Sequence, residues 1–495
     1  MDREKVYQSY FKIFFQIISV HFRKLFEIKL VALTCLLLNT VSCRSDISSD
    51  PIAILTHVYY VDSNQGNDTN NGLTEASAWK TFSNIENTKL APGDTLKFKR
   101  GSNFNTALYI KDSGEKDKYI VLTGYGSPKD KVAIFTNSVF KPDNNQYGNC
   151  IRLKGSYIIV EDLYFEHTVA ELSGNIGFTT MWELGAIYID KSASHCIIRN
   201  NELFDCGVGI KSYGQNALIE NNYIHDCNRV LKEWGWGPIG IWLGGDYQEV
   251  SYNRIFNYSA VDPRINWGPD GYGSGADGGA IEIDDGREPK SHIEIHHNYT
   301  RDNQGFIEVT WTDVVQNPSY SGFLIHHNVT DDYQQFIALW QGTGCRIENN
   351  TIIRRKVNVN DWGVFNITQY DSKNIIRNNI IVVEKNVVIF NVGQHGNSAP
   401  RNIISHNLYF AVSGELKLGL EGPGESAIFE DPKFSVYSTA TQAADFSITS
   451  SSPAIDKGMD LGYKIDFSGV NIPQGKTADV GAFEYFGLKG YMKSK

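Results

Sequence analysis

Excess positive charge, closely spaced cysteine pairs and long apolar runs are all missing from this chain, and each absence excludes a class of protein. The formal net charge is −10 over 495 residues, so nucleic acid is not an expected partner. The 7 cysteines include no CxxC pair, which excludes a zinc site of that type. The apolar run at residues 30–38 is too short to span a bilayer.

The main feature of the sequence is a repeated unit in which β-branched and apolar residues precede an Asn and more apolar residues follow it. The eight copies are centred on Asn201, Asn222, Asn253, Asn298, Asn328, Asn350, Asn379 and Asn407. Apolar residues recur at period two within each unit, and no helical periodicity separates the units. This array predicts an all-β fold, a parallel β-helix with the Asn residues stacked as an internal ladder at a turn. A β-propeller or a sandwich is the alternative.

Two cysteines follow the same repeat. Cys206 and Cys227 are 21 residues apart, as are Asn201 and Asn222, so they are expected on successive coils. Neighbouring strands lie about 4.8 Å apart, which allows a disulfide. We expect buried thiols instead, because cysteine packs readily as a small apolar residue.

The first residues have the character of an export signal. Arg23, Lys24 and Lys29 precede the apolar run, and Thr40-Val-Ser-Cys43 follows it. Cys43 resembles the lipidation site of bacterial lipoproteins, although Thr40 stands where an aliphatic residue is usual. We therefore expect residues 1–43 to be a lipoprotein signal and residues 44–56 a polar tether. An ordinary signal peptide without lipidation is the alternative.

Both ends of the remaining chain resemble those of the pectate-lyase-like right-handed β-helix superfamily. The N-terminal matches are Tyr60-Val-Asp62, Gly66-Asn-Asp68, Asn71-Gly72, Trp79-Lys-Thr81 and Pro92-Gly-Asp94. The C-terminal matches include Glu430-Asp-Pro-Lys-Phe434, Ser452-Pro-Ala-Ile-Asp456 and Asp479-Val-Gly-Ala-Phe-Glu-Tyr485.

The resemblance implies a right-handed parallel β-helix with a cap at each end. The N-terminal cap and first coils would occupy residues 57–126, the solenoid 127–426, and the C-terminal coil and cap 427–495. A short amphipathic helix at 82–89 would cover the first coil, whose strand edges are otherwise unpaired. The superfamily includes secreted polysaccharide lyases, glycoside hydrolases and epimerases, and the fold chooses none of them.

Paired carboxylates are the candidate catalytic groups. Aligning Ile281 with Ile307 puts Glu282 in register with Glu308, and alternation turns both outward, with Asp284, on one sheet. Strand spacing gives Glu282 and Glu308 the roughly 5 Å separation of retaining glycosidases, and the diagonal from Asp284 to Glu308, about 8 Å, fits inverting enzymes. Two like charges this close favour one protonated acid beside one ionised base. The sequence leaves both pairings open.

The same acids allow two other interpretations. They would form a purely structural acidic ladder if Arg287, Lys290 or Arg301 neutralised them. They would otherwise hold Ca²⁺, for which the ligands are Glu282, Asp284, Asp285 and Glu308. A calcium-assisted lyase or epimerase acting on a uronate glycan would then take its base from Lys211, His225 or Lys232.

Aromatic residues favour a sugar cleft. Seven of the nine tryptophans lie between residues 234 and 362, and tryptophan is hard to pack inside a narrow β-helix, so we expect them at exposed faces and loops. The Gly-rich loop 258–279 would wall one side of the site. The predicted substrate contacts are Trp242, Trp267, Trp311, Trp340 and Asp285. Aromatics that only cover the coils are the alternative. His296 and His326, at matching repeat positions, are expected to stack at a turn rather than bind a ligand.

These observations predict an exported, monomeric β-helix, held at the outer membrane by a lipid and facing the periplasm or the cell surface, that acts on a polysaccharide or oligosaccharide. Glycoside hydrolysis by Glu282, Asp284 and Glu308 without a cofactor is the favoured chemistry. A Ca²⁺-assisted lyase or epimerase and a non-catalytic glycan-binding surface protein are the alternatives.

The anchor is tested by Cys43→Ser. We expect the variant to leave the membrane fraction, because the lipid is the only predicted membrane attachment. Fractionation followed by immunoblotting measures this. A wild-type protein already found in the soluble fraction would show that Cys43 is not lipidated.

Overall fold

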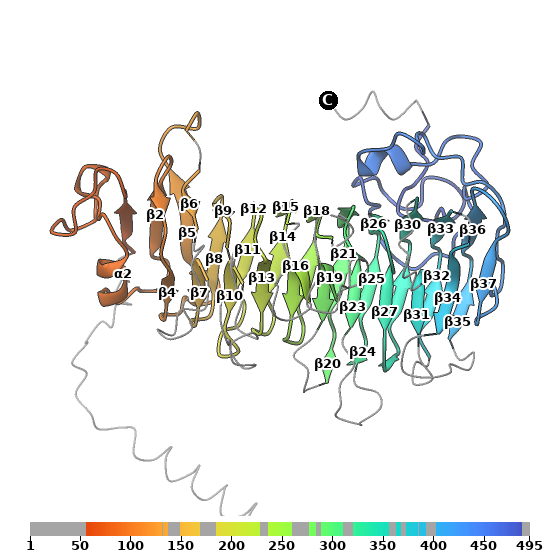
Figure 1. The fold of residues 1–495 in the computed structure, drawn as a ribbon, viewed down its shortest axis with the longest axis horizontal. Helices are drawn as coiled ribbons and strands as arrows, with labels where there is room; N and C mark the ends of the chain where they lie inside the picture. Colours follow the sequence, from red (N-terminus) through yellow and green to blue (C-terminus); the bar gives the residue numbers. More distant parts are fainter. Residues whose placement is uncertain are drawn as a thin grey trace, which may run out of the picture. The chain divides into compact units, whose positions relative to one another are not determined.

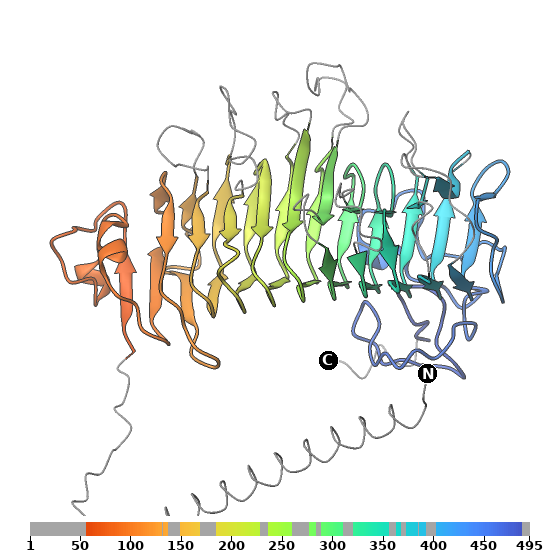
Figure 2. The same ribbon diagram turned by 90° about the horizontal axis from the view of Figure 1, so that it is seen from below.

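The computed structural model describes residues 56–130, 132–136, 149–168, 185–227, 236–259, 277–283, 289–309, 320–355, 363–367, 373–384, 386–392 and 402–487. Within these ranges the chain winds as a parallel β-helix, so the predicted fold class is confirmed (Figures 1 and 2). A coil contributes one strand to each of three sheets, and each named strand pairs in parallel with the equivalent strand of the next coil.

Sheet A has 12 strands. They are β1 (Val58–Val61), β2 (Thr95–Lys99), β5 (Ile120–Tyr125), β8 (Ile158–Glu161), β11 (Ile197–Arg199), β14 (Leu218–Glu220), β17 (Glu249–Ser251), β21 (Glu294–His296), β25 (Leu324–His326), β29 (Arg346–Glu348), β32 (Ile375–Arg377) and β35 (Ile403–Ser405). Sheet B has 11. They are β3 (Asn103–Phe104), β6 (Ile134–Phe135), β9 (Tyr164–Glu166), β12 (Glu202–Phe204), β15 (Tyr223–His225), β18 (Arg254–Phe256), β22 (Tyr299–Arg301), β26 (Val329–Asp331), β30 (Thr351–Arg354), β33 (Ile380–Val383) and β36 (Leu408–Ala411).

Sheet C also has 11 strands. They are β4 (Leu108–Ile110), β7 (Ile151–Leu153), β10 (Ile187–Ile189), β13 (Val208–Ser212), β16 (Trp236–Leu243), β19 (Asp277–Ile283), β23 (Ile307–Val309), β27 (Ile337–Leu339), β31 (Phe365–Ile367), β34 (Val388–Val392) and β37 (Lys417–Gly419). A small sheet joins β20 (Lys290–Ser291), β24 (Tyr320–Ser321) and β28 (Gly342–Thr343). The described helical segments are short: η1 (Glu75–Ser77), α2 (Ser83–Asn87) and η3 (Ala443–Phe446). None of the helices in the described ranges has the length and apolar character needed to cross a membrane.

The interior of the coils is a stack of aliphatic side chains. In sheet C one column runs Ile187, Ile210, Ile241, Ile281 and Ile307, each paired in register with the next. All five side chains are buried. Removing them from water is the main favourable term that holds one coil on another.

The Asn ladder is also present. Each of the eight Asn side chains except the last donates from Nδ2 to Oδ1 of the Asn on the following coil, at 2.9–3.1 Å. The same Oδ1 accepts the backbone N–H of the preceding Asn. A positive backbone angle φ occurs one residue before the Asn. Residues such as Asn221, His297 and Asn378 have φ between 52° and 57° there, so the bend precedes the ladder.

The ends of the described chain are closed differently. At the N-terminal end α2 is shorter than predicted, and Phe82 and Ile85 beside and within it join the core of the first coils. Phe82 stacks on Phe104 at a centroid distance of 4.9 Å.

The five cysteines of the described residues are buried thiols, so Cys206 and Cys227 form no disulfide.

Residues after β37 turn back along the outside of the solenoid. They form a second apolar core against outward-facing side chains of sheet B, in which Phe446, Val480 and Phe483 pack with Val329 and Ile380. Figures 1 and 2 show this segment beside β26, β30 and β33. The C-terminal segment therefore covers the side of several coils.

The ladder is tested by Asn298→Ala. The substitution removes the acceptor of the Asn253 backbone N–H and of its Nδ2, at 2.9 and 3.0 Å, and leaves Asn328 without one of its donors. Buried polar groups left without partners cost roughly 1–3 kcal/mol each, so we expect the free energy of unfolding to fall by about 3 kcal/mol or more. Denaturant unfolding measures it. Asn103→Ala, at an exposed strand position, is the control, and an equal loss in both variants would contradict the ladder's role.

A second prediction concerns pH. Asp332 accepts from the backbone N–H and Nδ2 of Asn303 at 3.0 and 2.8 Å, and burial, acting against these hydrogen bonds, raises its pKa to about 7. The folded chain then binds more protons than the unfolded chain between about pH 4 and pH 7, so this contribution to stability falls as pH rises through that window. Asp332→Asn is expected to flatten the fall, measured by thermal unfolding against pH. Exposed Asp431→Asn is the control, and an unchanged slope in Asp332→Asn would contradict the prediction.

Candidate active site on the outer face of sheet C

The outer face of sheet C carries the predicted glutamate pair. Glu282 on β19 and Glu308 on β23 are direct partners in the parallel register, as predicted from the alignment of Ile281 with Ile307. Adjacent strands are about 4.8 Å apart, so the two side chains leave the sheet as neighbours. The later coils continue the column with Ala338 and Asn366.

The column extends to the N-terminal side of the glutamates. Glu282 pairs in register with Trp242, Trp242 with Lys211, and Lys211 with Tyr188. Arg152 pairs with Tyr188 one coil earlier. One outward row of side chains, which we call the site column, therefore consists of Arg152, Tyr188, Lys211, Trp242, Glu282, Glu308, Ala338 and Asn366. Its cationic members, Arg152 and Lys211, precede the glutamates. The two members that follow them, Ala338 and Asn366, are uncharged.

Strand length marks the middle of the site column. Within the described residues, β16 and β19 have 8 and 7 residues, whereas β10, β23 and β27 have 3 each. Trp242 and Glu282 therefore lie within strands and not in loops. A site on strands is positioned more rigidly than one on loops.

The glutamates are not exposed, contrary to the prediction. Glu282 and Glu308 are each only 7% accessible. The neighbours in the column lie one strand spacing away on both sides and cover much of the solvent-accessible surface of each side chain. Alternation along a single strand does not reveal this effect. Two carboxylates on adjacent strands repel each other when both are ionised, so a shared proton or a positively charged neighbour has to offset that repulsion.

Trp242 and Trp340, the tryptophans of this face whose side chains the structure describes, are buried too, which corrects the expectation that they are exposed. Trp242 has no accessible surface, and the Nζ atom of Lys211, which is equally buried, lies 3.1 Å from its ring centroid. Trp340 is 5% accessible and donates from Nε1 to Oδ1 of Asn366 at 2.8 Å. The Trp242 ring therefore packs against its column neighbour Lys211, and Trp340 is held by a hydrogen bond to the next coil.

Arg152 was missed by the sequence reasoning. Its guanidinium lies 4.5 Å from the Tyr188 ring centroid and 3.0 Å from Asp190. Burial opposes ionisation of Asp190, but hydrogen bonds from Ser192 and Arg152 outweigh it and lower the pKa of that carboxyl. The strand 151–153 precedes the first Asn repeat, so the repeat could not place it. Its alternating pattern was the available signal.

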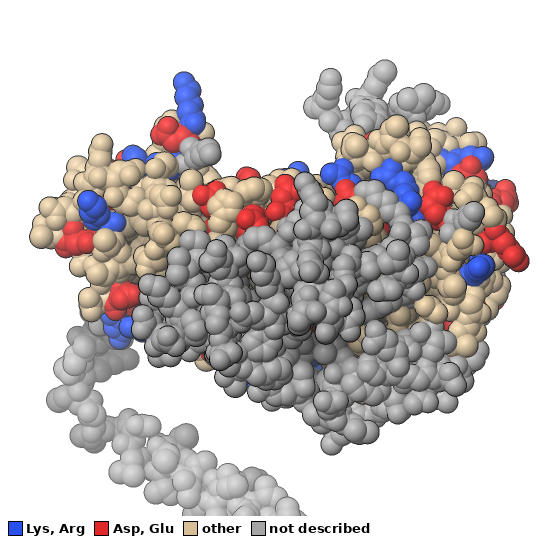
Figure 3. All heavy atoms as spheres, viewed as in Figure 1, with Lys and Arg blue, Asp and Glu red and all other residues tan. Residues whose placement is uncertain are grey.

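His225, one of the predicted alternative bases, lies elsewhere. It ends β15 of sheet B, where Nδ1 lies 2.8 Å from Asp226 and Nε2 lies 3.4 Å from Glu202. Lys211 belongs to sheet C, so the two do not share a site. Figure 3 shows acidic side chains gathered along the edge over β9 to β18, the part of sheet B to which His225 belongs.

Several predicted site residues lie outside the described residues. They are Cys43, Lys232, Trp267, Asp284, Asp285 and Trp311. Of the four carboxylates predicted to hold Ca²⁺, the structure describes Glu282 and Glu308. Carboxylate oxygens of neighbouring strands are suitable hard ligands, so this pair fits one side of such a site.

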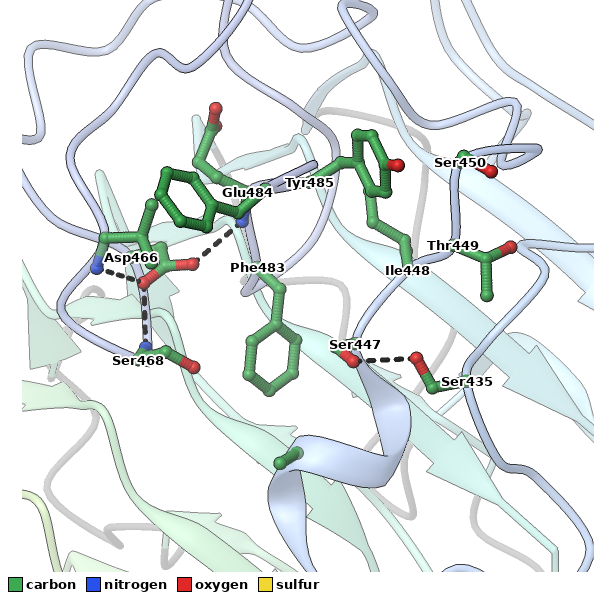
Figure 4. Close-up of a pocket in the computed structure, with 13 residues that line it drawn as sticks. Ser435, Ser447, Ile448, Thr449, Ser450, Asp466, Ser468, Phe483, Glu484 and Tyr485 are labelled. Carbon is green, nitrogen blue, oxygen red and sulfur yellow. Dashed lines mark hydrogen bonds between the residues drawn. The ribbon is translucent and has the colours of Figure 1, made fainter. Parts of the chain in front are cut away.

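The C-terminal segment encloses a hollow of its own, about 580 Å³ in volume (Figure 4). Of its two carboxylates, Asp466 accepts the backbone N–H groups of Ser468, Val470 and Glu484, and Glu484 accepts those of Gln474 and Asp479. The Ser435 and Ser447 hydroxyls bond to each other. These polar groups are committed to holding the segment's own backbone. Both carboxylates of the hollow therefore already serve the fold of the segment itself.

Comparison with known proteins agrees with this architecture. The family model described as a right-handed β-helix region matches residues 101–352, just over half of the chain. Lacto-N-biosidase of Bifidobacterium longum subsp. longum is 37% identical over 86 residues, which are 16% of this chain and only 5% of that protein.

Two solved structures are similar to this chain at low sequence identity. Pectate lyase Pel9A is similar with a TM-score of 0.50 and 15% identity, covering 88% of this chain and 98% of its own. The GH136 lacto-N-biosidase from Eubacterium ramulus has a TM-score of 0.37 and 15% identity, covering 76% of this chain and 67% of its own. The similarity to Pel9A shows a shared fold and leaves the reaction open.

Proposed function

The chain belongs to the right-handed β-helix family, with a pectate-lyase-like fold, and from that premise we propose that it is a carbohydrate-active enzyme that cleaves glycosidic bonds at the site column. A relative by sequence is named a lacto-N-biosidase, and a solved structure with the same fold is named a pectate lyase. Both names denote enzymes that cleave carbohydrates. The substrate class is therefore a polysaccharide or an oligosaccharide.

The proposal depends on one observation, the in-register pairing of buried Glu282 and Glu308. Glycosidases use one protonated and one ionised carboxyl, and burial of two neighbouring carboxyls favours that state without a metal. The spacing of adjacent strands matches the roughly 5 Å separation of retaining enzymes, in which one carboxylate is the nucleophile and the other the acid/base. Glycoside hydrolysis is thus the favoured reaction.

Trp242 and Lys211 have a supporting role in this scheme. Trp242 lies between Lys211 and Glu282 in the site column, so its ring fixes the side of Glu282 that faces the N-terminal coils. The ammonium over that ring supplies a positive charge two strand spacings from Glu282. Such a charge favours ionisation of the nearer glutamate, which assigns the protonated role to Glu308. Asp284 remains the predicted partner of Glu308 in an inverting reaction.

Lys211 also motivates the second candidate function, a polysaccharide lyase acting on a uronate glycan. A fully buried lysine pays a desolvation cost for its charge, and a neutral amine can abstract a proton next to a carboxylate. Glu282 and Glu308 would then hold a Ca²⁺ ion that neutralises the uronate carboxylate. The contact with Trp242 favours the ammonium form and argues for hydrolysis.

The two reactions leave different products. We would incubate the purified protein with pectate, alginate, further plant and algal glycans and a chromogenic lacto-N-bioside, and score both reducing ends and unsaturated-product absorbance. Reducing ends without absorbance identify a hydrolase, and both signals identify a lyase. Binding without either product would leave a glycan-binding surface protein and contradict the proposal.

The residues are tested by Glu282→Gln and Glu308→Gln. Each amide keeps the shape but cannot exchange the proton, so we expect kcat to fall by roughly 10²- to 10⁴-fold. Circular dichroism and thermal unfolding should stay close to wild type. Exposed Glu202→Gln on sheet B is the matched control. Wild-type turnover in both site variants would exclude the site column as the active site.

Lys211→Met and metal chelation separate the mechanisms. A hydrolase is expected to keep activity in EDTA and to retain part of it in Lys211→Met. A lyase is expected to lose activity in EDTA and in Lys211→Met. The activity lost in EDTA should return with added Ca²⁺ but not with added Zn²⁺.

A further inference from the structure

A cluster of histidines and glutamates lies on sheet A, away from the site column. Ligand atoms of Glu294, His296 and His326 all lie within 4.8 Å of one another. His296 and His326 are register partners at the ends of β21 and β25, and their rings stack at a centroid distance of 4.8 Å with an interplanar angle of 4°. The sequence led us to expect stacked rings in a turn. The rings do stack, but at strand ends with carboxylates beside them.

Two carboxylates face the imidazoles from the adjacent column. Glu249 and Glu294 are themselves register partners on β17 and β21. Nε2 of His296 lies 3.1 Å from Glu249, and Nε2 of His326 lies 3.0 Å from Glu294. Two neutral imidazoles and two carboxylates carry a net charge of about −2, which a divalent cation would balance.

The outer sides of both imidazoles are held by further histidines. Nδ1 of His296 lies 2.8 Å from Nδ1 of His297, and Nδ1 of His326 lies 2.9 Å from Nδ1 of His327. Each Nδ1 pair can share only one proton. Metal-binding histidines are usually oriented in this way, by a hydrogen bond from the ring nitrogen that does not bind the metal.

The position of His297 sets the direction of the first of these bonds. Its Nε2 lies 3.2 Å from the carbonyl oxygen of Asp466, an acceptor, so the proton of a neutral His297 is on Nε2. Nδ1 of His297 then accepts, and His296 donates from Nδ1. This tautomer leaves a lone pair on Nε2 of His296 that faces an oxygen of Glu249. Two lone pairs facing each other at that distance repel unless a metal ion lies between them or His296 takes up a second proton.

We propose that Glu294, His296 and His326, with Glu249 as fourth ligand, form a binding site for one divalent transition metal ion of the zinc class. Imidazole nitrogen and carboxylate oxygen are suitable zinc ligands, and four of them suit a tetrahedral site. Tetrahedral geometry with bonds of about 2.0–2.1 Å places ligand atoms about 3.4 Å apart, so the present cluster closes by rotation of side chains. The Glu249 and Glu294 side chains, 45% and 43% accessible, are free to rotate.

The site would connect three coils and the C-terminal segment. Glu249, Glu294 and His326 come from successive strands of sheet A. The Tyr463 ring stacks on His326 at 4.6 Å, and the Asp466 carbonyl holds His297. Arg346, near His326, is occupied by Glu348, whose carboxylate lies 3.9 Å from it. A metal ion here would therefore stabilise the coils where the C-terminal segment is attached.

The test is direct metal binding by the untagged, full-length protein after chelator treatment and dialysis. Calorimetric titration with ZnCl₂ near neutral pH is expected to show one ion per chain. Glu294→Gln and His296→Gln should each weaken binding at least ~10-fold. The intense visible absorption of tetrahedral Co²⁺ should appear in the wild type and disappear in both variants. Zn²⁺ should raise the unfolding temperature of the wild type alone.

The matched control is His292→Gln, another histidine of this face that stacks on Tyr247 outside the cluster, and its Zn²⁺ affinity should equal that of the wild type. Metal-free variants must unfold at the wild-type temperature, which separates lost ligands from lost folding. The proposal is wrong if the wild type binds no stoichiometric Zn²⁺. It is equally wrong if binding is unchanged in Glu294→Gln and His296→Gln, or falls as much in His292→Gln. None of these readouts depends on the glycan reaction.

Discussion

The parallel hydrogen-bonded register between successive coils is the constraint on which the rest of this molecule depends. Side chains alternate with period two, so a slip of one residue would turn every buried aliphatic outward. The Asn ladder opposes such a slip, because each amide bonds both to the next Asn and to a backbone N–H at the corner between sheets A and B. A shifted coil would leave these buried groups without partners.

The same register stacks chemically similar side chains at one strand spacing. Apolar columns gain from this arrangement, but charged columns need compensation. The glutamates of sheet C lie beside the buried Lys211–Trp242 contact, and the histidines of sheet A lie beside two carboxylates. A solenoid thus generates closely paired ionisable groups without any loop, and both candidate sites of this chain arise at such pairs.

The three outer faces serve different purposes. Sheet C carries the site column, sheet A the histidine cluster, and sheet B the second apolar core with the C-terminal segment. The division follows from composition. Val329, Ile353 and Ile380 give sheet B an apolar outer surface that has to be covered, whereas the outer side chains of the site column are mostly polar or aromatic.

The sequence alone determined the β-helix, the Asn ladder and the in-register pairing of Glu282 with Glu308, because these depend only on the repeat and on alternation within a strand. It could not determine what lies beside a strand in space. Contacts between residues far apart in the chain decide three features. They bury Glu282 and Trp242, put Lys211 and His225 on different sheets, and pack the C-terminal segment along sheet B. The histidine cluster shows the same division. The repeat predicted that His296 and His326 would stack. It did not show that the Glu249 side chain turns toward His296, or that the carbonyl of Asp466, far along the chain, reaches the neighbouring His297.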